Sequence, residues 1–343
     1  MLRIDAPPQP KRKFVSEFCL GLIHSEIAVV VAQQITDKSL TIDKVTEAFL
    51  EKCHIYIICS RPNLWFNPDA QKINHVGNTA ILSGELCLRK AGVVTTKQYF
   101  DILHLEDGCR AVLEDYPHRS ILAVQKNGEV SRYFPANLVA QRKLAGTEFS
   151  DCKVLYVGQA FGAEGDRNAL DRLRNHATLQ RIFADTLKNE PDAEIVVVLA
   201  NYEKPLLFTE FDGSADVADD AQVEKERLDS IVDNPPNLKK VVCLAEAGLI
   251  RYFQPHYNEM YKEHFPRAQQ KILDDCFKLD FAAITCEMTT DDLKFRLYSD
   301  TVEAGFHHIK MFRLHNPEQR RTFSTFVDKD GHYAPVEIDG PIY

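Results

Sequence analysis

The hydrophobic pattern of the first part of the chain predicts helices followed by one strand. From Phe14 to Cys53 the apolar residues recur at helical spacing, with a break at 36–40. Thr41 is a suitable capping residue for the second of these helices. The short apolar run from His54 to Cys59 predicts a buried strand. We therefore expect an N-terminal α/β region over 14–115, whose role the sequence does not indicate.

The next stretch predicts a hairpin and a further strand. The segments Ser120–Gln125 and Glu129–Phe134 are joined by Lys126-Asn127-Gly128. An Asn-Gly pair provides the positive φ angles that tight turns require. A strand is expected over Val154–Gly158, followed by a glycine-bearing loop.

Two core helices and another strand complete the central region. The first helix is expected from 166 or 168 to about Lys188, and the strand from Glu194 to Ala200. This strand is almost wholly branched and apolar, which is typical of a strand covered on both faces. The second helix is expected over Leu238–Phe253, where Pro255 stops it. The predicted fold class is therefore α/β (α+β): a small mixed sheet with flanking helices.

The C-terminal part, 263–343, predicts a small α/β annex. Its expected elements are a helix, a strand at Phe281–Cys286, a helix at Asp291–Ala304, a strand at His308–Leu314 and a final helix from Pro317.

Composition indicates a soluble protein of two or three domains. The chain has 343 residues and 45% hydrophobic content. The longest early apolar stretch, Cys19–Ile35, contains His24, Glu26 and two glutamines, so we expect neither a membrane span nor a secretory signal. Nine cysteines without paired spacing favour buried, reduced thiols over a disulfide framework or a zinc site. A cytoplasmic location is expected.

Charge is distributed unevenly along the chain. The net charge of -9 argues against indiscriminate coating of nucleic acid. Between Glu210 and Asp233, however, there are nine acidic residues and only two basic ones, Lys225 and Arg227. This composition predicts an exposed acidic insertion, helical from 221 to 231. A basic face is therefore still possible elsewhere. Residues 1–13 contain three prolines and end in Lys11-Arg12-Lys13, which predicts a flexible basic tail.

Four residue types in this pattern suggest chemistry. Arg172 and His176 are four residues apart, so one helix would project both from the same face. An arginine there stabilises charge on a phosphate, and a histidine accepts or passes a proton near neutral pH. A solvated Arg-His pair is the structural alternative.

Glu246 and Tyr156 are the other two candidates. Glu246 has apolar neighbours four residues away on either side, so its carboxylate requires a partner. Mg²⁺ is one such partner and a salt bridge is the other. Tyr156 ends a strand with Gly158, where the phenol would orient a water or contact a phosphate and the glycine would permit close approach of substrate.

The joint pattern resembles the GIY-YIG nuclease module. Tyr156-Val157-Gly158-Gln159 is similar to the Tyr-Ile-Gly strand of that family, and the segment from Arg172 to His176 is similar to its Arg-x-x-x-His helix. The segment from Glu246 to Asn258 resembles the helix with the metal-binding glutamate and its closing asparagine. The resemblance covers about 140 of the 343 residues, roughly 120 to 260. It implies a nuclease domain over 116–262.

The family's first motif is missing at its usual distance. About ten residues before Tyr156 the chain reads Ala-Gly-Thr-Glu-Phe at 145–149 in place of Gly-Ile-Tyr. Tyr133, on the predicted hairpin, is the candidate substitute. The spacing between Tyr156 and Glu246 is also stretched, which the acidic insertion and the loop after Gly158 account for.

The resemblance implies a metal-dependent endonuclease acting on DNA. Mg²⁺ or Mn²⁺ on Glu246 would stabilise the leaving oxygen, and Arg172 would clamp the phosphoryl group. His176 or a tyrosine would take the proton from water. Arg174 and Gly158 are implied substrate contacts, and Asn258 would orient the site by hydrogen bonding.

Two other functions compete with this interpretation. A module that lost its first tyrosine would bind nucleic acid or a partner protein without catalysis. Alternatively, the loop with Gly162 and Gly165 would cradle the phosphates of a nucleotide, although it lacks the lysine and hydroxyl of a Walker motif.

Overall fold

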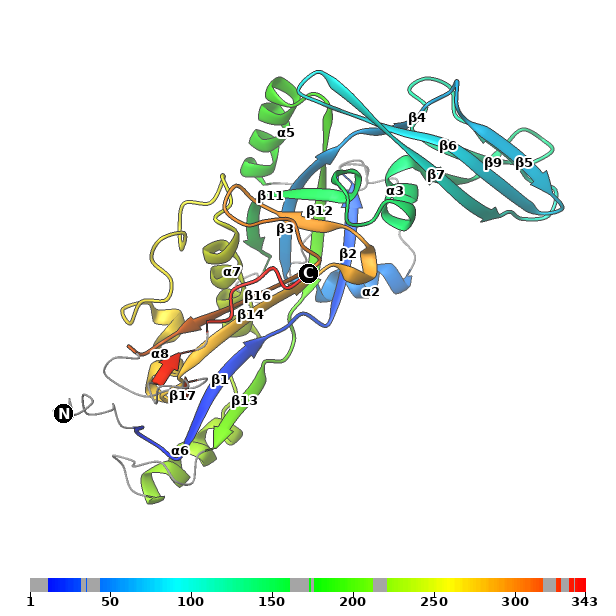
Figure 1. Cartoon of the computed structure of the whole chain (residues 1–343). Coiled ribbons are helices and arrows are strands. Elements are labelled where there is room, and N and C mark those ends of the chain that lie inside the picture. Colours follow the sequence, from blue (N-terminus) through cyan, green and yellow to red (C-terminus); the bar gives the residue numbers. More distant parts are fainter. Residues whose placement is uncertain are drawn as a thin grey trace, which may run out of the picture.

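The computed structural model of this chain describes residues 12–31, 35, 44–160, 173, 176–211, 221–316, 325–327, 333–335 and 337–343. Helices and mixed β-sheets alternate along the chain, which confirms the expected α/β (α+β) class (Figure 1). Within these residues no helix is both long and apolar enough to cross a membrane.

The central element is a five-stranded sheet in the order β15-β11-β3-β12-β2. Its strands are β2 (Glu26–Val31), β3 (Ile55–Pro62), β11 (Asp151–Gln159), β12 (Ala193–Asn201) and β15 (Arg296–Tyr298). The middle strand β3 pairs antiparallel with both β11 and β12. The strands predicted at 54–59, 154–158 and 194–200 are thus confirmed, and they lie side by side.

Two helices cover opposite faces of this sheet. Helix α5 (Ala177–Asn189) packs Leu179 and Ile182 against one set of alternating strand residues, which includes Tyr56 and Ile58. Helix α7 (Leu238–Phe253) packs against the other set, which includes Ile57. Because side chains alternate along a strand, each helix contacts every second residue. The predicted helix at 238–253 is confirmed.

A second sheet lies on the far side of α7. It has four strands in the order β13-β1-β14-β16. Their bounds are β1 (Ser16–Leu22), β13 (Leu206–Phe211), β14 (Ala283–Thr289) and β16 (His307–Arg313). Helix α7 and residues of both sheets form one hydrophobic core, and Figure 1 shows the helix between the two sheets. Residues from both ends of the chain therefore build this sheet around the central helix.

A β-rich insertion separates β3 from β11. Residues 63–150 form a hydrophobic core of their own, drawn at the upper right of Figure 1. The bounds are β4 (Leu64–Phe66), β5 (Lys72–Val76), β6 (Thr79–Lys90), β7 (Val93–His104), β8 (Arg110–Leu113), β9 (Ser120–Val124), β10 (Val130–Pro135), α3 (Ala136–Lys143) and η1 (Glu148–Ser150). The predicted hairpin is confirmed as β9 and β10, but it belongs to this insertion and not to the central sheet.

The remaining described elements are short. They are α2 (Lys44–Lys52), α6 (Ala221–Asp233), η2 (Lys271–Leu273), α8 (Asp274–Lys278), η3 (Asp291–Leu293), β17 (Thr325–Val327) and β18 (Tyr333–Pro335).

The helices expected in the first 35 residues are wrong, because this part forms β1 and β2. Strand β1 is buried along its whole length between β13 and β14, so its apolar residues follow no strand alternation. In β2, Ile27, Val29 and Val31 pack against the core, and such β-branched residues favour strands. Strand β14 pairs with β1 in parallel, so the predicted C-terminal annex does not form a separate sheet.

Two predictions for later segments also change. The helix expected at 291–304 is replaced by the single turn η3 and strand β15. The final helix expected from Pro317 begins outside the described residues, and residues 325–327 form a strand. In the C-terminal region the strands expected near 281–286 and 308–314 are confirmed as β14 and β16.

The acidic segment is only partly the exposed insertion that its charge predicts. Its helical part is confirmed as α6, but Arg227 of this helix is buried. The Arg227 guanidinium donates to the carbonyl oxygens of Ser16, Leu279 and Asp280 at 2.9–3.0 Å. It also lies 4.3 Å from the ring centroid of Phe14. Together with Glu224, whose carboxylate accepts from the backbone N–H and the hydroxyl of Ser16, Arg227 thus attaches the acidic helix to β1.

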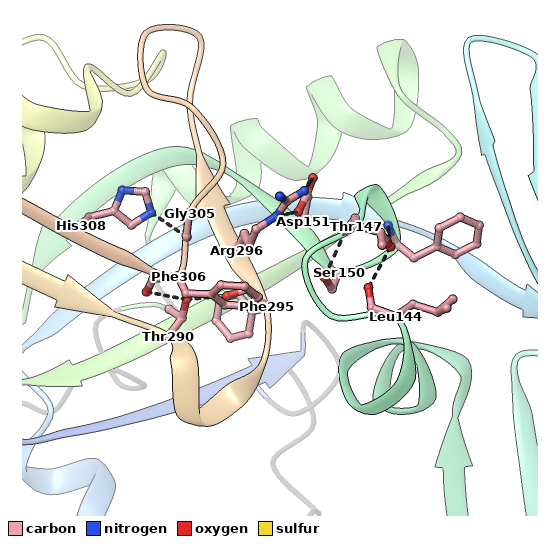
Figure 2. A network of polar contacts seen from close by, with 11 residues as sticks. Leu144, Thr147, Ser150, Asp151, Thr290, Phe295, Arg296, Gly305, Phe306 and His308 are labelled. Carbon is pink, nitrogen blue, oxygen red and sulfur yellow. Dashed lines mark hydrogen bonds and ion pairs between the residues drawn. The ribbon is translucent and has the colours of Figure 1, made fainter. Parts of the chain in front are cut away.

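A bidentate ion pair attaches β15 to the start of β11. Arg296 donates from Nε and Nη2 to the two carboxylate oxygens of Asp151, at 2.7 and 2.9 Å (Figure 2). Burial raises the pKa of the Asp151 carboxyl, and the Arg296 guanidinium offsets part of that increase. Strand β15 pairs only with residues 151–153 of β11. Beyond Lys153, this edge of β11 is therefore not covered by β15.

We predict that His308 makes stability depend on pH below neutrality. Its Nε2 donates to the Gly305 carbonyl at 2.8 Å (Figure 2). Its Nδ1 contacts the Tyr252 hydroxyl at 3.0 Å. Burial lowers the pKa of His308 from 6.5 to about 4. The unfolded chain therefore takes up this proton first, and the stabilisation present above pH 6.5 is lost as the pH falls towards 4.

Urea unfolding of the native protein and of His308→Gln, measured between pH 7 and pH 4, tests this. The native protein should lose about 3 kcal/mol more unfolding free energy over this range than the variant does, at ~1.4 kcal/mol per pKa unit. Parallel stability curves for the two proteins would show that His308 does not titrate in this way.

Candidate functional site

The site begins with the pairing of β3 and β11. Tyr56 lies opposite Gly158 in this antiparallel register, although about 100 residues separate them in the sequence. A β-carbon placed on Gly158 would lie 2.6 Å from the Tyr56 hydroxyl and 2.7 Å from the Tyr156 ring. Only glycine fits there, because the phenol of Tyr56 crosses the backbone at that point. The space beside Gly158 is filled by a tyrosine of this chain, and the predicted approach of a substrate to Gly158 stays a prediction.

Three aromatic side chains gather at this point. Tyr56 and Tyr156 have their ring centroids 6.2 Å apart in a stacked arrangement. The imidazole of His176 lies 5.3 Å from the Tyr156 ring, and its Nε2 lies 3.1 Å from the Tyr56 hydroxyl. The structure therefore brings the predicted residues Tyr156 and His176 together, and it adds Tyr56 to them.

His176 is not inside a helix, as its spacing from Arg172 suggested. It is the N-cap of α5, with extended backbone angles, and its Nδ1 accepts from the Leu179 backbone N–H at 3.2 Å. Because Nδ1 is an acceptor, the proton of the neutral ring is on Nε2, which then donates to Tyr56. The helix expected from 166 or 168 to about Lys188 therefore does not continue through His176. Arg172 and Arg174 lie outside the described residues, as do Gly162 and Gly165.

Asn258 closes the free edge of β11. Its Nδ2 donates to the Val157 carbonyl at 2.8 Å, and its Oδ1 accepts from the Val157 N–H at 2.9 Å. The adjacent Tyr257 N–H donates to the Leu155 carbonyl at 3.1 Å. A side-chain amide thus replaces a neighbouring strand beyond the point where β15 ends. This agrees with the expected orienting role of Asn258 through hydrogen bonds.

Glu246 lies at the α7 side of the same strand end. Its Oε2 accepts from Gln159 Nε2 at 2.8 Å, and the same amide lies 3.5 Å from the sulfur of Cys243. Burial raises the pKa of the Tyr261 phenol, and the charge of the Glu246 carboxylate raises it further. The carboxylate is half-buried, as its apolar neighbours on α7 predicted.

The predicted residues therefore fall into two groups on opposite faces of β11. Tyr56, Tyr156 and His176 lie on the α5 face, whereas Glu246 extends from α7 on the other face. Gln159, the last residue of β11, reaches Glu246. The strand end, from Tyr156 to Gln159, connects both groups.

Tyr133 does not occupy the position of the missing tyrosine. It lies on β10 within the insertion, opposite Leu122, and 59% of its surface is exposed. Tyr56 lies beside Tyr156 instead. The available signal was the Ile55-Tyr56 pair at the start of a buried strand, but its distance from Tyr156 concealed it.

The donor set at Glu246 is compatible with a divalent cation. A half-buried carboxylate and the neighbouring Gln159 amide provide oxygen atoms, which Mg²⁺ and Mn²⁺ prefer. Among the described residues, no group of three or more His, Cys, Asp or Glu side chains is suited to hold a metal. A cation here would therefore require water or substrate oxygens in addition, as Mg²⁺ commonly does.

Comparisons with family models, with curated proteins and with solved structures find no match to this chain.

We predict that Asn258 stabilises the fold by satisfying both polar groups of Val157. Asn258→Ala leaves a buried N–H and a buried carbonyl without these partners, at about 1–3 kcal/mol each. Urea unfolding should show a loss of about 2 kcal/mol or more. Asn127→Ala, in an exposed turn, is the control and should change stability by less than about 0.5 kcal/mol. Equal losses in the two variants would contradict the bridging role.

Proposed function

We propose that this chain is a divalent-metal-dependent endonuclease that hydrolyses phosphodiester bonds of DNA at the end of β11. The observation that carries the proposal is the meeting of Tyr56, Tyr156 and His176 on adjacent elements. It places a tyrosine of β3 next to the tyrosine of β11. The GIY-YIG resemblance requires such a tyrosine on the family's first strand, and the sequence spacing concealed it.

The contacts suggest different tasks for the aromatic residues. Tyr56 is only 1% exposed and His176 is 9% exposed, whereas Tyr156 is half-buried. Both ring nitrogens of His176 already have contacts, so His176 acts by holding the Tyr56 phenol. Tyr156 is then the residue that reaches an attacking water or a phosphate oxygen. Of the two expected proton acceptors, His176 or a tyrosine, this favours the tyrosine.

Hydrolysis requires that the water oxygen bonds to phosphorus while the bond to the leaving oxygen breaks. The proton of the water passes to a tyrosine phenolate or to solvent, and the leaving oxygen takes up a proton in turn. Glu246 would hold Mg²⁺ or Mn²⁺, which neutralises the charge on the leaving oxygen when it is bound. Asn258 keeps the strand end in place through Val157. The roles of Arg172 as a phosphate clamp and of Arg174 as a substrate contact stay predictions.

The burial of Tyr56 and His176 favours a second function. Aromatic residues with so little exposed surface also suit a scaffold that binds nucleic acid or a partner protein without cleaving DNA. Such a module would retain DNA on the protein at any metal concentration and release no product.

We predict that the purified protein cleaves DNA with Mg²⁺ or Mn²⁺ and that Glu246→Gln abolishes this. The amide keeps the size of the side chain and removes the charge that attracts the cation, so the rate should fall by about 100-fold or more. Product formation on a gel measures the rate, and urea unfolding confirms that the variant is folded. Glu194→Gln, at the start of β12, is the matched control.

Cleavage that persists in Glu246→Gln would contradict the metal assignment. DNA binding without cleavage by the native protein would instead support the scaffold.

A further inference from the structure

Helix α5 carries a single arginine, Arg181, five residues after its N-cap His176. At a rise of 1.5 Å per residue, Arg181 lies roughly 7.5 Å along the helix axis from that cap. This distance corresponds to about two nucleotides of a DNA strand, at about 3.4 Å each. Because His176 contacts Tyr156, a strand with one phosphate at Tyr156 has another phosphate within reach of Arg181.

Tyr257 places this arginine on the same face of the sheet as Tyr156. The Tyr257 backbone N–H donates to the carbonyl of Leu155, the residue before Tyr156, at 3.1 Å. Both tyrosines are half-buried and pack against the hydrophobic core on the α5 face of the central sheet. The Arg181 guanidinium lies over the Tyr257 ring, 5.5 Å from its centroid. A cation–π contact of this kind orients the guanidinium beside the end of β11.

The neighbours of Arg181 leave most of its donors available to a ligand. Its Nε lies 3.6 Å from Asp185 Oδ2, which is longer than a charge-assisted hydrogen bond of about 2.7–2.9 Å. The same carboxylate oxygen already accepts from the Tyr257 hydroxyl at 2.9 Å. The Arg181 side chain is 71% exposed. Its planar guanidinium therefore has N–H groups free to bind a phosphate in a bidentate way.

The position of Arg181 matters more for binding than for folding. An exposed ion pair four residues apart on a helix contributes little to stability. Contacts between basic side chains and phosphates, in contrast, supply much of the affinity of a protein for DNA. The arginine therefore has a larger effect as a ligand of the substrate backbone than as a partner of Asp185.

We propose that Arg181 binds the DNA backbone at a phosphate one or two nucleotides from the scissile bond, and that Tyr257 and Asp185 position its guanidinium. This inference deepens the proposed function and rests on its assignment of DNA as the substrate. Because the contact is to a phosphate, it fixes the register of the strand relative to Tyr156 without selecting a base sequence.

Binding of the full chain to a short fluorescein-labelled DNA duplex, measured by anisotropy in EDTA so that no cleavage occurs, tests this. Arg181→Gln should weaken binding by about 10-fold and reduce the slope of log affinity against log salt by about 1, between about 50 and 200 mM salt. Arg181→Lys should restore the slope, because it keeps the charge. Urea unfolding of each variant confirms that it is folded.

Asp185→Asn separates this role from a structural one. The amide can still accept from the Tyr257 hydroxyl, but it no longer opposes the charge of Arg181. DNA binding should therefore become tighter by about 2-fold or more. If the ion pair served only to hold the fold, Asp185→Asn and Arg181→Gln would both weaken binding, and that result would overturn the inference.

Arg132→Gln is the matched control, because Arg132 is another exposed arginine over an aromatic ring, 5.2 Å from the Phe134 centroid in the insertion. Its affinity and salt slope should match those of the native protein. An equal loss in Arg132→Gln, or an unchanged slope in Arg181→Gln, would overturn the inference and leave the cleavage proposal intact.

Two further outcomes concern the proposed function. If the native protein binds DNA through Arg181 but releases no product with Mg²⁺ or Mn²⁺, the endonuclease proposal is overturned and the phosphate contact stands. Absence of DNA binding by the native protein, with EDTA or with Mg²⁺, would overturn both.

Discussion

The arrangement of the site depends on the contact of Tyr56 with Gly158 across two paired strands. The phenol occupies the space that any larger residue at 158 would fill. This close approach places Tyr56 within reach of the His176 ring and beside Tyr156. The imidazole in turn caps α5, so the helix begins where the aromatic cluster requires it. Strand pairing, helix capping and the candidate chemistry thus share the same few atoms.

The other half of the site depends on how α7 is held. This helix is buried between two sheets, one of which combines strands from the N-terminal, central and C-terminal parts of the chain. Such a helix has little freedom to shift, so a carboxylate on it keeps a defined position. Gln159 and Asn258 then connect the end of β11 to α7 and to the segment that follows it. The long insertion leaves the chain after β3 and returns at the start of β11. Both of these strand ends lie away from Tyr56 and Gly158, so the insertion leaves this geometry intact.

The sequence predicted those elements whose pattern is local. Helix α7 has an unbroken apolar stripe and a proline after its end, and β12 is a continuous apolar run, so both were expected correctly. Strand β1 was mistaken for a helix because a strand buried on both faces shows no alternation, and the edge strand β2 was mistaken because its residues 27–31 are continuously apolar. Helix α5 was expected to start too early, because spacing alone does not show that His176 caps it.

The candidate site was predictable only in part for a similar reason. Tyr156, Glu246 and Asn258 lie in short segments with recognisable spacing, whereas Tyr56 is separated from Tyr156 by the whole insertion. Tyr133 was chosen because it is near in sequence, but distance along the chain does not determine which strands pair. The contacts of Gln159 with Glu246 and Cys243 depend on the packing of β11 against α7, for which no sequence motif exists.

The central claim is that Tyr56 and His176 act as one unit in metal-dependent cleavage, and a double-mutant cycle on the cleavage rate tests it directly. Tyr56→Phe removes the phenol hydroxyl and keeps the ring, and His176→Asn removes the imidazole while keeping a good helix cap. We expect the two losses to be strongly non-additive, with a coupling of about 1 kcal/mol or more, because each variant breaks the same contact. The account would be contradicted if the effects of the two variants on the cleavage rate were additive. It would also be contradicted if these effects were no larger than that of Tyr133→Phe.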